Sequence, residues 1–256
     1  MILLKLAAVP AVVWLASWAG RRWGHRASGL ISGLPVISGP ILLFVALETP
    51  RQFAADISWT TMSSSPAVAM HCLAYAWLAQ KPFGGRFHPL LCLLGAWLAY
   101  VGSAMVFSGF VLKGPHGALL AIGLMVTAAA LMPSVRAPIA IPRIPASEIL
   151  IRMLASLAIA TIVTLGAQTL GSRVSGILLA FPITASVLPL FTLALYGAQA
   201  TARLLTGFVT GLVGFALYFY LFATLILPSG IAIAALVGAV ASVVAVRGLT
   251  ALQRKV

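Results

Sequence analysis

The segment Arg26-Ala-Ser-Gly-Leu-Ile-Ser-Gly-Leu-Pro35-Val-Ile-Ser38 decides the organisation of the chain, because a related segment follows 147 residues later. The second copy reads Arg173-Val-Ser-Gly-Ile-Leu-Leu-Ala-Phe-Pro182-Ile-Thr-Ala185. Arg, Ser, Gly and Pro are identical at four positions, and most other positions exchange one apolar or small residue for another. Each copy follows an apolar run and is itself followed by two more. We therefore interpret the chain as two related halves.

The composition is that of a protein that spans a membrane several times. Apolar residues make up 62% of the 256 positions and charged residues only 7%, whereas about a quarter of a soluble domain is charged. The runs are apolar on every side, which favours helices over strands in a bilayer. Nine runs are predicted to span, at about Ile2–Ala19, Ser28–Leu47, Ala54–Gln80, His88–Phe110, Gly117–Met132, Ile149–Leu170, Ser175–Tyr196, Thr201–Leu227 and Gly230–Val246. A signal peptide is the alternative for the first run, but a matching run precedes the second copy of the motif.

The order of the runs predicts an all-α, polytopic transmembrane helix bundle with a 4+1+4 arrangement. The first four-span repeat covers residues 1–112, a linker span and loop cover 113–146, and the second repeat covers 147–256. A single linker span forces the second repeat to insert upside down. Such inverted-topology repeats, with broken helices, are a common plan of secondary transporters.

The net charge of +13, from 16 basic and 3 acidic residues, is explained by loop cations better than by nucleic-acid binding, because the basic residues form no patch. Nine spans divide them unequally between the two faces of the membrane. Twelve fall on one side: Arg21, Arg22, Arg26, Lys81, Arg86, Arg136, Arg143, Arg152, Arg203, Arg247, Arg254 and Lys255. Four fall on the other: Lys5, Arg51, Lys113 and Arg173. The positive-inside rule then predicts a bacterial inner-membrane protein with its N-terminus outside and its C-terminus in the cytoplasm.

The repeated motif predicts an interrupted helix in each half. Pro35 and Pro182 each remove a backbone donor and clash with the preceding turn. Pro/Gly-interrupted spans at matching positions are a sequence signature of a transport site, and a kink used only for helix packing is the alternative. The candidate substrate-binding residues around the two interruptions are Ser28, Pro35, Ser38, Gly39, Ser175, Pro182, Thr184 and Ser186.

Each motif begins with an arginine and, two residues later, a serine. Ser28 and Ser175 are predicted N-caps. Arg26 and Arg173 either reach toward lipid headgroups or attract an anion toward a helix N-terminus as gating residues.

A polar stripe follows one face of the third run. Its members are Asp56, Thr60, Ser64, Ala67, His71 and Tyr75, spaced three or four residues apart. A polar face is unfavourable against lipid, so we expect it to face the interior of the bundle. The matching face of the eighth run carries Arg203, Gly207, Gly211, Gly214, Tyr218 and Phe222, and glycines at this spacing allow another helix to approach closely.

Few residues in this chain carry titratable chemistry. His71 is interpreted either as a hydrogen-bonded structural residue or as a proton relay and substrate contact. Asp56 and Glu48 are further candidates for proton coupling, near the outer face. Cys72 and Cys92 lie inside apolar runs, so neither a disulfide nor a metal site is predicted, and no cofactor is expected.

The run Gly-Leu-x-x-x-Leu-Pro-x-x-Ser at Gly29–Ser38 resembles small bacterial inner-membrane proteins of the GlpM type, which look like single four-span units. The resemblance covers this motif and the order of the neighbouring spans. It implies that the chain is similar to a fused, inverted pair of such units.

These observations favour a small secondary transporter or exporter that moves a small, anionic solute by alternating access. A flippase for an anionic lipid or lipid-linked phosphate and a non-transporting membrane assembly protein are the alternatives. An enzyme is disfavoured, because three acidic residues and no His/Cys cluster leave little for catalysis. The expected partners are the lipid bilayer, a small-molecule or lipid substrate and a second copy of the chain, and not nucleic acid.

Overall fold

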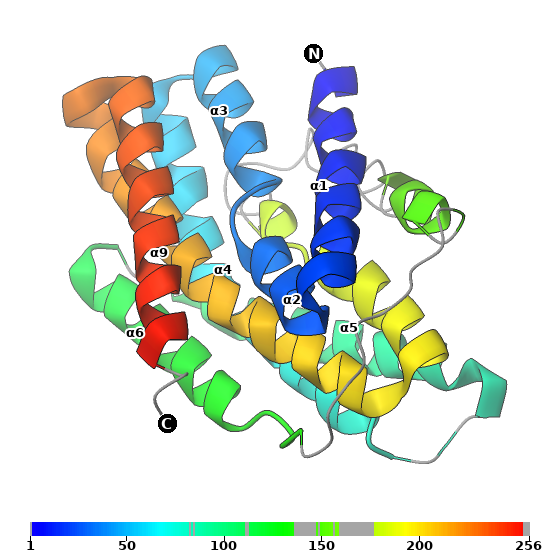
Figure 1. Cartoon of the computed structure of the whole chain (residues 1–256). Coiled ribbons are helices and arrows are strands. Elements are labelled where there is room, and N and C mark those ends of the chain that lie inside the picture. Colours follow the sequence, from blue (N-terminus) through cyan, green and yellow to red (C-terminus); the bar gives the residue numbers. More distant parts are fainter. Residues whose placement is uncertain are drawn as a thin grey trace.

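The computed structural model describes residues 2–81, 83, 85–110, 113–135, 147, 149–155, 157, 158 and 177–252. Within these residues the fold is all-α, as predicted, and no strand is present. Figure 1 shows the helices as a bundle in which α9 runs across α2 and α4. The elements are α1 (Ile2–Trp23), α2 (His25–Gly33), α3 (Ser38–Glu48), α4 (Arg51–Leu78), the 3-10 turn η1 (Gly85–Phe87), α5 (His88–Gly109), α6 (Pro115–Ala130) and α9 (Ile183–Leu252).

The described residues form seven α-helices, so the predicted count of nine spans is not reproduced. One reason is that α9 contains two non-helical residues, Gly197 with φ 79° and Gly230 with φ 82°. Only glycine adopts such positive φ values readily. These two glycines divide α9 into a first segment (183–196), a middle segment (198–229) and a last segment (231–252). Most of the expected sixth run, 149–170, lies outside the described residues.

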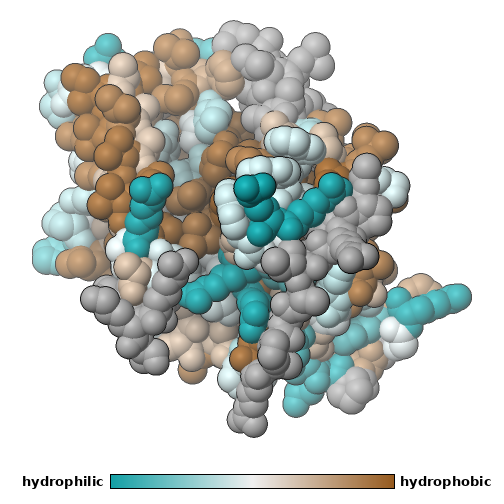
Figure 2. Space-filling model, in the orientation of Figure 1, coloured by the Kyte–Doolittle hydropathy of each residue, from teal (hydrophilic) through white to brown (hydrophobic). Residues whose placement is uncertain are grey.

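Among the described residues, three helical stretches are long and apolar enough to cross a membrane, which indicates membrane association. They are His25–Glu48, Gly85–Phe107 and Ile177–Ala251, and a shorter apolar helix covers Pro115–Ala130. Large apolar side chains are exposed on these elements, with Leu98 and Met105 of α5 at 75% and 71%. In Figure 2 apolar surface covers much of the upper part of the view, and hydrophilic side chains gather mostly in its middle and lower part. Apolar exposure on this scale marks a surface that contacts a membrane or another protein.

Helix α2 crosses the middle segment of α9 at a pair of glycine motifs. Gly29 and Gly33 of α2 face Gly207 and Gly211 of α9 so closely that a Cβ on any of them would overlap the backbone of the other helix. A Cβ on Gly211, for example, would lie 2.5 Å from the carbonyl oxygen of Leu30. The prediction that the eighth run accommodates a closely approaching helix is therefore confirmed, and α2 is that helix. Small residues at four-residue spacing allow backbones to meet in this way inside a membrane protein.

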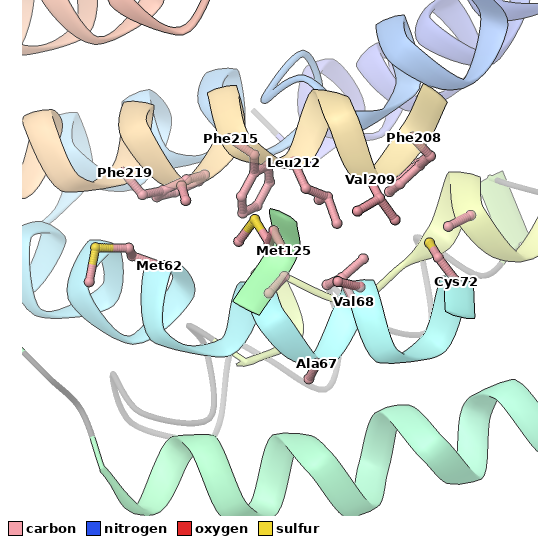
Figure 3. Packing of buried hydrophobic residues seen from close by; sticks show 14 of the residues in the cluster. Met62, Ala67, Val68, Cys72, Met125, Phe208, Val209, Leu212, Phe215 and Phe219 are labelled. Carbon is pink, nitrogen blue, oxygen red and sulfur yellow. The ribbon is translucent and has the colours of Figure 1, made fainter. Parts of the chain in front are cut away.

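The apolar core lies between α4 and the middle segment of α9. In Figure 3 Met62, Val68 and Cys72 of α4 lie across from an apolar row on α9, and Met125 of α6 reaches between them. The labelled α9 residues are Phe208, Val209, Leu212, Phe215 and Phe219. Because this packing holds α4 firmly against α9, it positions the polar face of α4.

One prediction about helix starts is wrong. Helix α2 begins at His25 with Gly24 as its N-cap residue, so Ser28 lies inside the helix. Gly24 has a φ of 84°, which places the turn between α1 and α2 four residues before the expected position. The carbonyl oxygen of Ser28, which is buried, accepts a hydrogen bond of 2.9 Å from Ser32 Oγ. The matching Ser175 lies outside the described residues.

Candidate functional site

The helix is interrupted at both repeated prolines. Helix α2 ends at Gly33, residues 34–37 form a turn that contains Pro35, and α3 begins at Ser38. In the second copy Phe181 and Pro182 are non-helical, and α9 begins at Ile183. The amide of Gly39 still reaches the Pro35 carbonyl at 2.8 Å, and the amide of Ile183 reaches the Phe181 carbonyl at 2.8 Å. Each interruption therefore keeps part of its backbone hydrogen bonding through short local turns.

The two interruptions contact each other, although they are far apart in the sequence. Ser38 Oγ donates a hydrogen bond of 3.0 Å to the carbonyl oxygen of Leu179, 141 residues away. Gly39, the next residue, lies against the ring of Tyr218. Thus Ser38, from the first motif, satisfies a backbone carbonyl freed in the second motif.

The polar face of α4 lies beside the second interruption. His71 is completely buried, and its Nε2 atom lies 3.1 Å from the carbonyl oxygen of Ala185 in the first turn of α9. Ser64 is also completely buried. Its Oγ atom, Ser63 Oγ and the Nδ1 atom of His71 have no hydrogen-bond partner within the described part of the chain. Buried polar atoms without partners are rare and mark positions where a further polar group can bind.

The N-terminal part of the α4 stripe is occupied by a hydrogen bond within α4 and by an ion pair with Lys113. Thr60 Oγ1 donates to the carbonyl oxygen of Asp56 at 3.1 Å. The Asp56 carboxylate forms an ion pair of 3.0 Å with Lys113, and both side chains are partly exposed. Glu48 is exposed at the last residue of α3. Glu48 therefore lies at the far end of α3 from the first interruption, and Asp56 is engaged with Lys113.

Helix α5 supplies two site residues that sequence reasoning missed. Trp97 Nε1 donates to Ser186 Oγ at 2.9 Å, and Tyr100 OH donates to the carbonyl oxygen of Ile177 at 2.8 Å. Both rings also contact Phe181, which lies within the second interruption. Their three-residue spacing in an otherwise apolar run was the available signal, because polar-tipped aromatic residues that are buried need a hydrogen-bond partner.

Of the remaining predicted site residues, some lie at the second interruption and others do not. Thr184 and Ser186 are buried in the first turn of α9, and Ser186 Oγ donates to the Pro182 carbonyl at 2.7 Å. Arg26 lies in the first turn of α2, where its carbonyl group faces Gly207. Arg173 lies outside the described residues.

A second buried polar cluster joins the start of α2 to α9. The His25 ring lies 5.1 Å from the ring of Tyr196, and His25 is 4% exposed. The guanidinium of Arg152 lies 5.5 Å from the ring centroid of Phe191, and Arg152 is buried. This arrangement places basic side chains inside the bundle at the side where the sequence predicts the cytoplasm.

The described residues contain no group of three or more His, Cys, Asp or Glu side chains that could hold a metal ion. Comparisons with protein-family models, with curated proteins and with solved structures gave no match.

Proposed function

We propose that the protein is a small secondary transporter that moves a small anionic solute through the site between the two interrupted helices. The observation that carries this proposal is the contact between Ser38 and Leu179, with His71 bonded to Ala185 and Ser64 buried about two turns away on the same face of α4. Non-helical backbone at membrane depth is tolerated where protein buries it or where it lines a water-filled cavity. Broken helices that meet near the middle of a bundle form the substrate sites of many transporters.

The polar groups of the site suit a small solute with negative charge. Helices α3 and α9 both begin at the interruptions, at Ser38 and Ile183. A helix N-terminus carries a partial positive charge and free amide donors, which favour anions. The nearby side chains offer hydroxyl, imidazole and indole groups, whereas Glu48 lies at the opposite end of α3 and Asp56 is paired with Lys113. A small anion would therefore meet donors and no opposing negative charge.

The proposal includes inverted halves, and two contacts support it. The 147-residue offset of the motif relates His71 to Tyr218 and Gly39 to Ser186. His71 bonds to Ala185, next to Ser186. Tyr218 lies against Gly39, since a Cβ at this glycine would lie 3.5 Å from the tyrosine hydroxyl. Related residues thus make related contacts, which is expected if two similar units face each other.

A nine-span topology with termini on opposite sides of a bacterial inner membrane belongs to the same proposal. The beginning of α1 and the end of α9 lie at opposite ends of the molecule in Figure 1. The exposed Arg21 and Arg22 at the end of α1 would then lie at the cytoplasmic face.

Flux through the purified protein in liposomes tests the proposal. The probes are chloride, nitrate and inorganic phosphate as anions, and glycerol and urea as neutral solutes. The test variant is Ser64→Ala, which removes a buried hydroxyl of the site. Its control is Ser103→Ala on α5, whose hydroxyl bonds only to its own helix, at the Ala99 and Tyr100 carbonyls.

We expect protein-dependent flux of at least one anion, about tenfold slower in Ser64→Ala and unchanged in Ser103→Ala, because one hydrogen bond to a charged group contributes about 1.5–3 kcal/mol. Unchanged thermal unfolding of both variants would show that they fold. Equal flux in Ser64→Ala and the wild type would contradict the site assignment, and no flux of any probe would contradict transport of small solutes.

A further inference from the structure

The hydrogen bond of His71 determines where its ring can carry a proton. The Ala185 carbonyl oxygen, 3.1 Å from Nε2, can only accept a hydrogen bond, so Nε2 must carry the hydrogen. In the neutral ring Nδ1 is then a bare acceptor. This atom is completely buried, and none of the described residues forms a hydrogen bond with it. A neutral His71 therefore presents a lone pair, and not a donor, to whatever lies beside Nδ1.

An anion cannot bind favourably against that lone pair. Protonation of Nδ1 changes this, because the imidazolium carries a positive charge and donates from both nitrogens. The backbone of Ala96 on α5 also lies near the ring, so a carbonyl group is available on the α5 side as well as on the α9 side. The charged ring would thus retain its bond to Ala185 and gain a donor at Nδ1 on the α5 side, where Trp97 also bonds to Ser186.

The helices that flank His71 carry titratable side chains that are neutral in their ordinary state, and these are Cys72, Tyr75, His88, Cys92, Tyr100, Tyr196, Tyr218 and Tyr220. Their charged side chains are Arg51 and Asp56 of α4 and Arg203 and Arg247 of α9. Helix α6 contributes His116, which is exposed. The described carboxylates are Glu48 at the end of α3 and Asp56 in its ion pair with Lys113. An imidazolium at position 71 would therefore need an anion from outside the described residues to balance its charge.

We infer that the transported anion binds together with one proton, which is held on Nδ1 of His71. This inference rests on the proposed transport function and names its coupling ion. The proton adds to the lone pair of Nδ1 when the anion enters and leaves that atom when the anion leaves, so no covalent bond of the anion changes. A monovalent anion and the imidazolium together carry no net charge. Burying such a pair costs far less than burying either charge alone.

The experiment measures anion and proton movement in the same liposomes. Purified protein is reconstituted with a pH-sensitive dye inside, and an inward gradient of chloride, nitrate or inorganic phosphate is applied with the protonophore absent. We expect wild-type protein to acidify the lumen as the anion enters, with one proton for each chloride or nitrate. Since the pair is neutral, the rate should not change when a potassium gradient and valinomycin impose a membrane potential.

The variant His71→Gln keeps an amide donor for the Ala185 carbonyl but cannot become a cation. We expect it to lose anion flux and acidification together, by at least tenfold, while its thermal unfolding is unchanged. His116→Gln makes the same substitution at an exposed histidine and should behave as the wild type. The proton-to-anion ratio of the wild type tests the inference even if His71→Gln does not fold.

The outcomes separate this inference from the proposed function. Wild-type anion flux without acidification, or flux driven by the membrane potential, would contradict the binding of a proton to His71. Either result would still agree with the proposed transport of an anion. If glycerol or urea moves and no anion does, both this inference and the anionic substrate of the proposed function are overturned. Coupled flux that persists in folded His71→Gln would also overturn this inference. No movement of any of the five probes would overturn the transport function and this inference with it.

Discussion

Replacing Gly29 with alanine should separate the two helices at the centre of the bundle. A Cβ at this position would overlap the carbonyl oxygen of Leu204 and would lie 2.9 Å from the backbone nitrogen of Phe208. Neither contact can relax by rotation of a side chain, because both atoms belong to the backbone of α9. Helix α2 would have to move away, and the close approaches at Gly33, Gly207 and Gly211 would loosen with it.

The size of the effect follows from two opposing contributions. Inserting a methyl group into a well-packed contact costs about 1–3 kcal/mol, and the backbone contact favours the upper value. Alanine in place of glycine within a helix regains about 1 kcal/mol. A net loss of about 2 kcal/mol corresponds to a melting temperature lower by about 4–8 °C for a chain of this size.

The control is Gly102→Ala on α5, because no atom lies within 4 Å of a Cβ built there. It should melt at the wild-type temperature or up to about 4 °C higher, since only the helix propensity changes. Both cysteines are free and buried, so a thiol-reactive fluorophore in detergent reports unfolding directly. If Gly29→Ala melted at or above the temperature of Gly102→Ala, the close crossing of α2 and α9 would be refuted.

Three further expectations concern the site and the topology. Trp97→Phe removes the 2.9 Å hydrogen bond to Ser186 and should lower the free energy of unfolding by about 1 kcal/mol, measured with the same thiol assay; no change would show that this bond does not stabilise the site. Asp56→Asn breaks an ion pair that is partly exposed, so the free energy of unfolding should fall by less than about 1 kcal/mol and anion flux should persist. Loss of anion flux in this variant would show that Asp56 takes part in proton coupling. Single cysteines at the two ends of the chain, in a background without Cys72 and Cys92, should react with an impermeant maleimide on opposite sides of the membrane, and labelling from one side alone would contradict the nine-span topology.

Local chemistry explains which features could be predicted. Proline interrupts a helix because of its own ring and its missing amide hydrogen, so the interruptions at Pro35 and Pro182 were expected from sequence and are present. The glycine face of Gly207 and Gly211 likewise follows from the absence of a side chain. The all-α class follows from uniformly apolar runs, whose backbone groups can be satisfied only within a helix in lipid.

Features that depend on competing local geometries were predicted less well. Ser28 has good capping chemistry, but Gly24 turns the chain earlier because its φ of 84° is accessible to glycine. The count of helices differed because Gly197 and Gly230 bend the chain without a loop. A glycine that kinks a continuous helix and a glycine that ends one look the same in a hydropathy pattern.

The sequence by itself determined that this chain is helical and apolar enough to enter a membrane, and that its two halves carry a repeated, proline-interrupted motif. These properties depend on residues within one or two helical turns of each other. Only the tertiary structure decided that Ser38 meets Leu179, that His71 bonds to Ala185 and that Trp97 and Tyr100 reach the second interruption. Each of these contacts joins residues separated by more than 70 positions. Their partners are backbone carbonyls and a hydroxyl made available where helices break and pack, and no side-chain pattern specifies in advance which helix will reach them.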